Sequence, residues 1–438
     1  QIVDDPGSVP EEFPTEEAQE KERQRLFRLV EKLVKWENSN NEVVLHTARM
    51  EIARSIARDE GIGFSANMST EECLAFLREH APPVLDPFCG GGSIPLESQR
   101  LGLKAYARDL NPVAVIITKA LIEIPPKFAG THPVNPEARK QRKVHGGGWK
   151  GAQGLAEDVR YYGEWIRDEA KKRVGHLYPK AKLPGEMGGG EATVIAWLWA
   201  RTVKCPNPAC GSRIPLVKSF ALSTKVGKAA WVEPIVDKKS KAVAFRIHTV
   251  GGVPQDGTVN RLGAICLVCE SPVPLEHVRS ESREGRMAVI PLAIVAEGQR
   301  GRVYLPPDIE QAKVARSAEP AFRPEGEIAD NPGHTNVYRY GLTKWGDLFT
   351  PRQLTALATF SNLVKEAIEL ARRDAIAAGL ADDVSGIEAG GVGARAYAEA
   401  VGTYLAFVVD KLSDLNNSLC TWKLDAECPV HLFARQAI

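Results

Sequence analysis

The stretch VLDPFCGGGSIPLE, residues 84–97, places three consecutive glycines after an apolar run and an Asp-Pro pair. This pattern predicts a short buried strand, a glycine loop and the start of a helix that Gly102 ends. The next apolar run, KAYARDL, predicts a second strand with Asp109 close to its end. A strand, glycine loop and helix followed by a strand with an acidic end are typical of Rossmann-type folds that hold an adenosine group.

The residues around the glycines argue against two common nucleotide sites. The dinucleotide fingerprint G-x-G-x-x-G uses its third glycine to let the helix pack on the strand, and Pro95 stands at that position here. A phosphate-binding P-loop requires Lys-Ser/Thr after its glycines, and no such pair follows Gly92. The loop therefore predicts a different adenosine-containing ligand.

The overall composition is that of an ordinary globular protein of two or three domains. The 438 residues are 44% hydrophobic and 25% charged, and the net charge is +1, so a nucleic-acid partner must be bound by local basic patches. No run of 18 apolar residues predicts a membrane span. The polar, acidic N-terminus does not resemble a secretory leader, which favours a cytoplasmic protein. A chain that begins with Gln1 is expected to be part of a longer protein.

Apolar periodicity and capping signals predict the main elements of secondary structure. Helices are expected at 15–36, 42–58, 69–79, 93–102, 154–175, 350–378 and 393–414. Strands are expected at 82–88, 104–110 and 191–205, the last with Trp197 and Trp199 on one face, and short β segments through 201–300. Residues 111–124 fit either a helix or an extended segment. Residues 138–156 predict a basic, flexible loop, either a solvated surface or a nucleic-acid contact.

Four of the eight cysteines form two close pairs, Cys205/Cys210 and Cys266/Cys269. Such pairs, joined through β-like sequence, predict a zinc ribbon with four thiolates and a closed, structural site. Cys73, Cys420 and Cys428 are expected to be buried free thiols. Lysines in the same region fit either a phosphate-contacting face or an ordinary solvated surface: Lys218, Lys225, Lys228, Lys238, Lys239 and Lys241.

The segment DPFCGGGSIPLESQRLGLKAYARDLNPVA, residues 86–114, resembles the S-adenosylmethionine-binding half of amino-methylating DNA methyltransferases, whose first motif has the form D-P-F-x-G-x-G. The resemblance implies that Asp86 accepts from the cofactor's ammonium group, Phe88 walls the pocket and Asp109 holds the ribose. The glycines would then allow close backbone approach instead of anion binding. The cofactor-binding residues so implied are Asp86, Pro87, Phe88, Cys89, Gly90, Gly91, Gly92, Ser93, Asp109, Leu110 and Asn111.

Combined with the cysteine pairs, this motif makes the chain similar to the zinc-ribbon-containing adenine-specific DNA methylases with an uncharacterised N-terminal domain. Further segments carry the resemblance: LVKWENSNNE (33–42), WLWARTVKCPNPACG (197–211), YGLTKWGDLFTPRQL (340–354) and LSDLNNSLCTW (412–422). It implies an α/β fold with a Rossmann-like methyltransferase core, helical flanking regions and an inserted β-rich zinc ribbon. The implied domains are a helical region 1–80, the first part of the core 81–190, the ribbon 191–300 and a helical region 301–438 leading to the rest of the core.

The activity that the resemblance implies is methyl transfer from S-adenosylmethionine to an exocyclic amino nitrogen of a flipped base in double-stranded DNA, adenine N6 first of all. The nitrogen attacks the methyl carbon in line, so no cysteine nucleophile is needed and Cys89 serves as a pocket wall. Members of this family are associated with prokaryotic DNA modification and phage defence, which makes defence-system proteins expected partners.

One part of the family pattern is missing. The motif Asp/Asn/Ser-Pro-Pro-aromatic, which holds the target base, does not occur: IPPK, APPV and LPPD lack both its polar first residue and its aromatic last residue. In the family it would follow FARQAI, and a His-Trp-Trp motif would precede Gln1, so both are expected outside these residues and the catalytic residues stay unassigned. A catalytically incomplete nucleic-acid-binding or scaffold subunit with a vestigial cofactor fold is an alternative, as are cytosine N4 or RNA targets. A nicotinamide-dependent oxidoreductase is a further alternative, against which Pro95 weighs.

Overall fold

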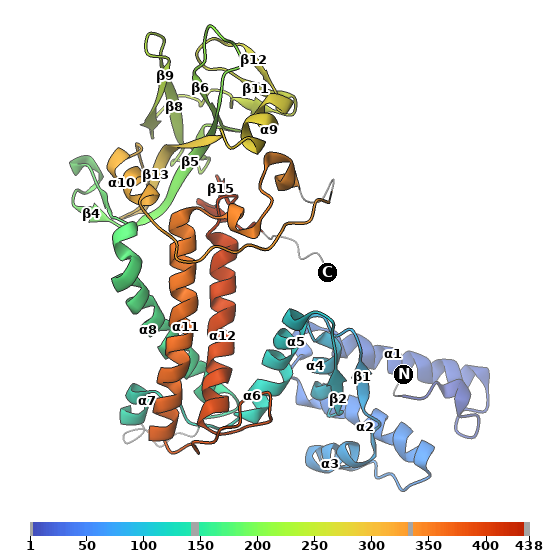
Figure 1. Ribbon diagram of the computed structural model, residues 1–438. Helices are drawn as coiled ribbons and strands as arrows, with labels where there is room; N and C mark the ends of the chain where they lie inside the picture. The colour runs from blue at the N-terminus through green and yellow to red at the C-terminus, as the bar shows by residue number, and fades with distance from the viewer. Residues whose placement is uncertain (1–2, 142–148, 332–335, 433–438) are drawn as a thin grey trace. The chain divides into compact units, whose positions relative to one another are not determined.

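A computed structural model describes residues 3–141, 149–331 and 336–432 of the protein (Figure 1). The described residues divide into two compact units, one within 1–158 and 374–403 and the other within 159–373 and 404–437. Helices and strands are mixed, in agreement with the α/β class. None of the described helices is both long enough and apolar enough to cross a membrane.

Three helices precede the glycine loop in the first unit: α1 (Glu16–Leu33), α2 (Glu42–Glu60) and α3 (Thr70–His80). The predicted capping box at the start of α3 is confirmed, because Ser69 and Glu72 each accept from the other's backbone N–H. The α2 and α3 helices bury a common apolar cluster that includes Ile56 and Leu77. The helix predicted at 15–36 ends at Leu33, and the chain continues as a separate 3-10 turn at Trp36–Asn38.

The two strands predicted around the glycine loop exist and are short: β1 (Val84–Asp86) and β2 (Ala105–Ala107), separated by α4 (Ser93–Arg100). They pair in parallel, with Leu85 opposite Tyr106. These two side chains share one face of the sheet and are 59% and 49% exposed. Parallel sheets normally have both faces covered, so this face is uncovered within the described residues.

The segment that fitted either helix or strand is helical. It forms α5 (Pro112–Thr118), a π-helical turn (Lys119–Glu123) and α6 (Ile124–Lys127). Local signals explain this outcome, because the Asn111 side chain accepts from the N–H of Val113 and Pro112 occupies the first helical position. These end signals outweigh the β propensity of the branched residues that follow.

The prediction of a loop over 138–156 is wrong at both of its ends. Helix α7 (Pro136–Gln141) occupies the first part, capped by the Asn135 side chain, which accepts from the N–H of Ala138 at 2.8 Å. Helix α8 (Gln153–Val174) begins before the segment ends. Residues 142–148, which include Arg142, Lys143 and the glycines, lie outside the described residues.

Helix α8 runs beside α11 (Pro351–Ala377) and α12 (Ala394–Leu415), as Figure 1 shows, and most residues of α8 and α11 belong to the second unit. Arg173 on α8 and Glu366 on α11 form a two-fold hydrogen-bonded ion pair at 2.7 Å. The predicted start of α11 is confirmed, because Thr350 and Gln353 exchange backbone-to-side-chain hydrogen bonds. Short helices and turns complete the helical part: α9 (Leu275–Arg283), α10 (Ile309–Arg316) and 3-10 turns at Pro6–Ser8, Trp36–Asn38, Gly175–Leu177, Gly185–Met187, Asn336–Tyr340 and Trp345–Leu348.

The β segments predicted between 191 and 300 form antiparallel sheets of the second unit. The largest has the order β14-β13-β5-β6, made of β5 (Val194–Lys204), β6 (Arg213–Leu216), β13 (Ala288–Gly298) and β14 (Gly301–Leu305). A second contains β7 (Ala221–Ser223), β8 (Ala230–Asp237) and β9 (Ala242–His248), and a third β10 (Val259–Asn260), β11 (Gly263–Ile265) and β12 (Pro272–Pro274). The first two sheets enclose a core that includes Phe220, Val232 and Tyr304.

Helix α9 inside this region was not predicted. Two hairpins were also missed: β3 (Ala181–Lys182) with β4 (Glu191–Ala192), and β15 (Thr421–Lys423) with β16 (Cys428–Val430). The second hairpin and β14 lie within 301–438, a region predicted to be helical. All of these strands have at most five residues, too few for a period-2 pattern to stand out in the sequence.

Trp197 and Trp199 lie on one face of β5, as predicted, and each meets an arginine. The Arg352 guanidinium stands 4.2 Å from the Trp197 ring centroid and the Arg316 guanidinium 5.7 Å from that of Trp199. Arg352 is only 8% exposed and donates to the backbone carbonyl of Leu177. Burial lowers the pKa of Arg352, and the aromatic faces compensate part of the desolvation of its charge.

Candidate metal centre and glycine loop

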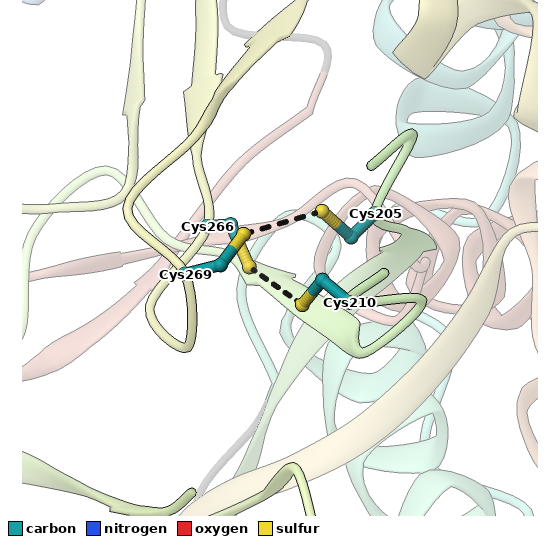
Figure 2. A group of neighbouring side chains, drawn as sticks. All are labelled: Cys205, Cys210, Cys266 and Cys269. Atoms are coloured by element: carbon teal, nitrogen blue, oxygen red, sulfur yellow. Dashed lines mark hydrogen bonds between the residues drawn. The ribbon is translucent and has the colours of Figure 1, made fainter. Parts of the chain in front are cut away.

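The sulfur atoms of the four paired cysteines converge in the second unit, as Figure 2 shows. The Sγ atoms of Cys205 and Cys269 lie 3.7 Å apart, those of Cys210 and Cys266 lie 3.9 Å apart, and all four lie within 4.8 Å of one another. Four sulfurs at about 2.3 Å from a tetrahedral zinc ion would be separated by about 3.8 Å. The arrangement can therefore hold a metal ion such as zinc.

Hairpins position the two pairs. Cys205 and Cys210 lie in the turn between β5 and β6, and the second pair lies in the turn between β11 and β12. In each turn the first cysteine donates its backbone N–H to the carbonyl of a serine just past the second cysteine: Cys205 to Ser212 at 2.8 Å, and Cys266 to Ser271 at 3.0 Å. The strand pairing thus closes both turns in the same way.

The same two serines place hydroxyls against the sulfurs. Ser212 Oγ lies 3.1 Å from Cys210 Sγ and 3.3 Å from Cys266 Sγ, while Ser271 Oγ lies 3.4 Å from Cys269 Sγ. Hydrogen bonds from Ser271 lower the pKa of Cys269 to about 6, and those from Ser212 lower the pKa of Cys210. Burial instead raises the pKa of Cys205 to about 12. Two of the four thiols are thus prepared for the ionised form that binds a metal.

Ser212 and Ser271 were missed by sequence reasoning, and Lys241 was expected only as a phosphate-contacting or solvated lysine. The Lys241 ammonium donates to the backbone carbonyls of Ala209 and Cys210, at 2.8 and 2.9 Å, and so braces the first turn. A signal for the serines was present, because both stand two positions after the second cysteine of their pair. Four sulfur ligands leave no open coordination position, so the arrangement suits a structural ion and not a catalytic one.

The glycine loop of the first unit is closed by Asp109. Its two carboxylate oxygens accept from the backbone N–H groups of Gly90 and Asn111, at 2.9 and 2.8 Å. These hydrogen bonds, that of Asn111 first, lower the pKa of Asp109. Asp86 is 7% exposed and accepts from the N–H of Phe88 at 3.1 Å. Both predicted acids thus contact backbone N–H groups of residues 88–90, Asp86 from the end of β1 and Asp109 from just past β2.

The loop is tightly packed on one side and open on the other. A side chain at Gly92, where φ is 79°, would stand 2.7 Å from the Thr118 hydroxyl, which itself donates to Cys89 Sγ at 3.4 Å. Apart from the glycine and its two chain neighbours, no residue has an atom within 4 Å of where a Cβ would stand on Gly90 or Gly91. Phe88 and Leu110 beside this open space are 77% and 94% exposed.

The remaining predicted residues lie as follows. Pro87 lies in the turn after β1, Ser93 begins α4, and Asn111 caps α5. Cys73 is buried as expected, whereas Cys420 and Cys428 are only half-buried, and all eight cysteines are free of disulfides.

No protein family, curated protein or solved structure was found to match this chain. The glycine loop with its two acids and the cluster of four cysteines are therefore the two features of the chain that indicate a function. Of these, only the glycine loop offers open space beside polar groups for a reacting ligand.

Proposed function

We propose that this protein is an S-adenosylmethionine-dependent methyltransferase that acts on an exocyclic amino group of DNA, with adenine N6 as the target. The observation that carries the proposal is the loop closed by Asp109 on Gly90, with open space above Gly90 and Gly91. A parallel β1–β2 pair presents this loop at the carboxyl ends of its strands, where open α/β sheets bind their ligands.

The residues present fit the cofactor. Each Asp109 oxygen uses one lone pair on a backbone N–H and keeps another that can accept from a ribose hydroxyl. One carboxylate oxygen of Asp86 accepts from the backbone N–H of Phe88, and the other would accept from the ammonium group of the cofactor. Phe88 and Leu110 supply exposed apolar surface that a purine ring would cover. When bound, S-adenosylmethionine supplies an activated methyl group.

The residues that hold the target base are not assigned. Of the three Pro-Pro segments, IPPK forms the short helix α6, and none has the polar first residue and aromatic last residue of a base-holding motif. This observation favours a second candidate, a nucleic-acid-binding subunit that retains the cofactor loop without catalysis. Cytosine N4 and RNA remain alternative targets, and a role in prokaryotic DNA modification or phage defence rests on the family resemblance alone.

For the four cysteines we propose a zinc ion that stabilises the β-rich region. The sulfur geometry and the closed ligand set support this role. It leaves the chemistry of methyl transfer to the glycine loop and to the residues that bind the base.

Isothermal calorimetry with S-adenosylmethionine tests the proposal. Gly91→Val fills the open space at a position where a Cβ meets no atom, so this variant should keep the fold and lose binding. Asp109→Ala should also lose binding, because it removes the acceptor and the loop closure. Gly63→Val, another open position in the same unit, is the matched control and should bind as the unaltered protein does. Equal binding by all four proteins would overturn the assignment.

A further inference from the structure

An open pocket of about 410 Å³ lies in the second unit, apart from the cysteine cluster. Three segments line it: the β7–β8 turn with Lys225 and Lys228, the β13–β14 hairpin with Arg302, and the β15–β16 turn with Glu427. These segments are far apart in the sequence and meet only in the folded unit. Their convergence makes the pocket a feature of the fold.

Glu427 anchors the floor of the pocket. It is 4% exposed, and its carboxylate accepts from the Tyr304 hydroxyl at 2.9 Å and from the Lys225 ammonium at 2.5 Å. Its φ is 54°, a left-handed conformation that costs free energy for a residue with a side chain. Such strain persists only where surrounding contacts impose it, and it is concentrated at ligand-binding positions in proteins.

The six lysines that could have formed a phosphate-contacting face fall into separate groups. Lys241 braces the first cysteine turn, and Lys225 is paired with Glu427. Lys218 is exposed outside the pocket, and Lys238 and Lys239 lie at the exposed β8–β9 turn. Of these six lysines, only Lys228 both lines the pocket and has no carboxylate partner among the residues that the structure describes.

Lys228 and Arg302 are the cations of the pocket available to a ligand. Lys228 is held over the β13–β14 hairpin by donating to the Arg300 carbonyl at 2.8 Å. Arg302 stands opposite Glu297 in the β13–β14 register, yet within the described ranges no carboxylate lies at ion-pair distance from either cation. The pocket has three basic and two acidic side chains, an excess of one positive charge.

We propose that this pocket holds one phosphodiester group of a nucleic-acid backbone between Lys228 and Arg302. A phosphodiester carries a single negative charge, which matches the excess of one positive charge better than a dianionic free phosphate does. The contact gives affinity without reading sequence, because phosphates are the same at every base pair. The inference rests on the proposed function for the partner, DNA, and adds a place where the β-rich unit touches it.

Fluorescence anisotropy with a labelled duplex, at salt concentrations from about 50 to about 200 mM, tests the contact. In the double variant Lys228→Gln/Arg302→Gln we expect weaker binding of every duplex by the same factor. The slope of log Kobs against log salt should fall in magnitude by about 0.9, because the two side chains together neutralise one phosphate. Arg302→Lys, which preserves the charge, should keep the slope of the unaltered protein.

The matched control is Lys238→Gln/Lys239→Gln, which removes the same number of charges from an exposed turn outside the pocket. If it lowers the slope as much as the pocket variant does, only overall charge matters and the assignment is overturned. Thermal unfolding of each variant shows that the fold is retained.

Competition experiments separate the two sources of phosphate. A short oligonucleotide should displace the labelled duplex, while inorganic phosphate should act no more strongly than chloride at equal ionic strength. Stronger displacement by inorganic phosphate would overturn the phosphodiester assignment. Cofactor calorimetry on the same samples distinguishes the two hypotheses. If the unaltered protein binds the cofactor but the pocket variant binds DNA as the unaltered protein does, only the pocket assignment is overturned. If the unaltered protein does not bind the cofactor, the proposed function is overturned.

Discussion

Gly211 and Glu270 occupy the same position in the two cysteine turns and adopt the same left-handed backbone conformation, with φ of 59° and 60°. Each directly follows the second cysteine of its pair. Glycine enters this region without steric cost, whereas a residue with a Cβ loses about 1–2 kcal/mol there. The first turn therefore has the residue that its conformation favours, and the second turn carries strain.

Glu270→Gly should stabilise the protein. Removing the left-handed strain gains about 1–2 kcal/mol, and the greater freedom of glycine in the unfolded chain costs roughly 0.5–1 kcal/mol, so a net gain of up to about 1.5 kcal/mol is expected. Urea unfolding followed by circular dichroism measures it. Glu276→Gly, in the right-handed helix α9, is the control and should destabilise by about 1 kcal/mol. A loss of stability in Glu270→Gly would contradict the strain argument.

The hydroxyls of Ser212 and Ser271 should strengthen metal binding, because they stabilise the ionised sulfurs that they contact. Residues that support metal ligands in this way typically contribute 10–100-fold in affinity, and we expect a loss of about that size for Ser212→Ala and Ser271→Ala. Competition for zinc with a chromophoric chelator measures the affinity. Ser240→Ala, whose hydroxyl bonds Asp237 instead, should bind zinc unchanged. Unchanged affinity in both test variants would show that the hydroxyls only fill space.

Sequence reasoning found the parts of the protein whose signals are local. Each of these signals lies within a few residues of sequence: the capping residues of α3 and α11, the glycine loop with its flanking strands, and the two cysteine pairs. The cysteine pairs were expected in one centre, and the structure brings their sulfurs together. These features depend on hydrogen bonds between near neighbours, which single-sequence patterns capture well.

Features that depend on distant contacts were missed. The β15–β16 hairpin is held by Trp422, whose indole N–H donates to the Leu222 carbonyl. Leu222 lies far from Trp422 in the sequence, so no local pattern predicts this contact. Glu427 and its contacts with Tyr304 and Lys225 are equally non-local. The first part of the loop predicted at 138–156 belongs to helix α7, which Asn135 caps, a signal that the basic composition obscured.

Tyr397 and Asp158 form a buried pair in the first unit that should be important for stability. Both are fully buried, and the carboxylate accepts from the tyrosine hydroxyl at 2.6 Å and from Val134 and Asn135. Tyr397→Phe leaves one oxygen without this donor and should lower the free energy of unfolding by about 1–3 kcal/mol. Urea unfolding measures the change. Tyr338→Phe, on a partly exposed turn of the other unit, is the control, and a loss in Tyr397→Phe no larger than in this control would contradict the prediction.

The same pair predicts a pH dependence. Burial raises the pKa of Asp158 above its ordinary value, against the opposing hydrogen bonds from Tyr397 and the backbone. Between the two pKa values the folded protein binds more protons than the unfolded chain, so stability falls as pH rises through that interval. Loss of the tyrosine hydroxyl should raise the pKa further and extend the interval upward. Unfolding of Tyr397→Phe at a series of pH values should therefore show the decline continuing to higher pH than in the unaltered protein.

Glu427 predicts the opposite dependence. Burial opposes its ionisation, but hydrogen bonds from Lys225 and Tyr304 prevail and hold its pKa below the ordinary value. Its contribution to stability is therefore complete above the ordinary glutamate pKa of about 4.3 and is lost as pH falls through the lowered pKa. Between about pH 5 and pH 3, the unaltered protein should lose more stability than Glu427→Gln, which has no such group to protonate. Parallel stability curves for the two proteins over this range would show that the carboxylate is no better stabilised in the fold than in the unfolded chain.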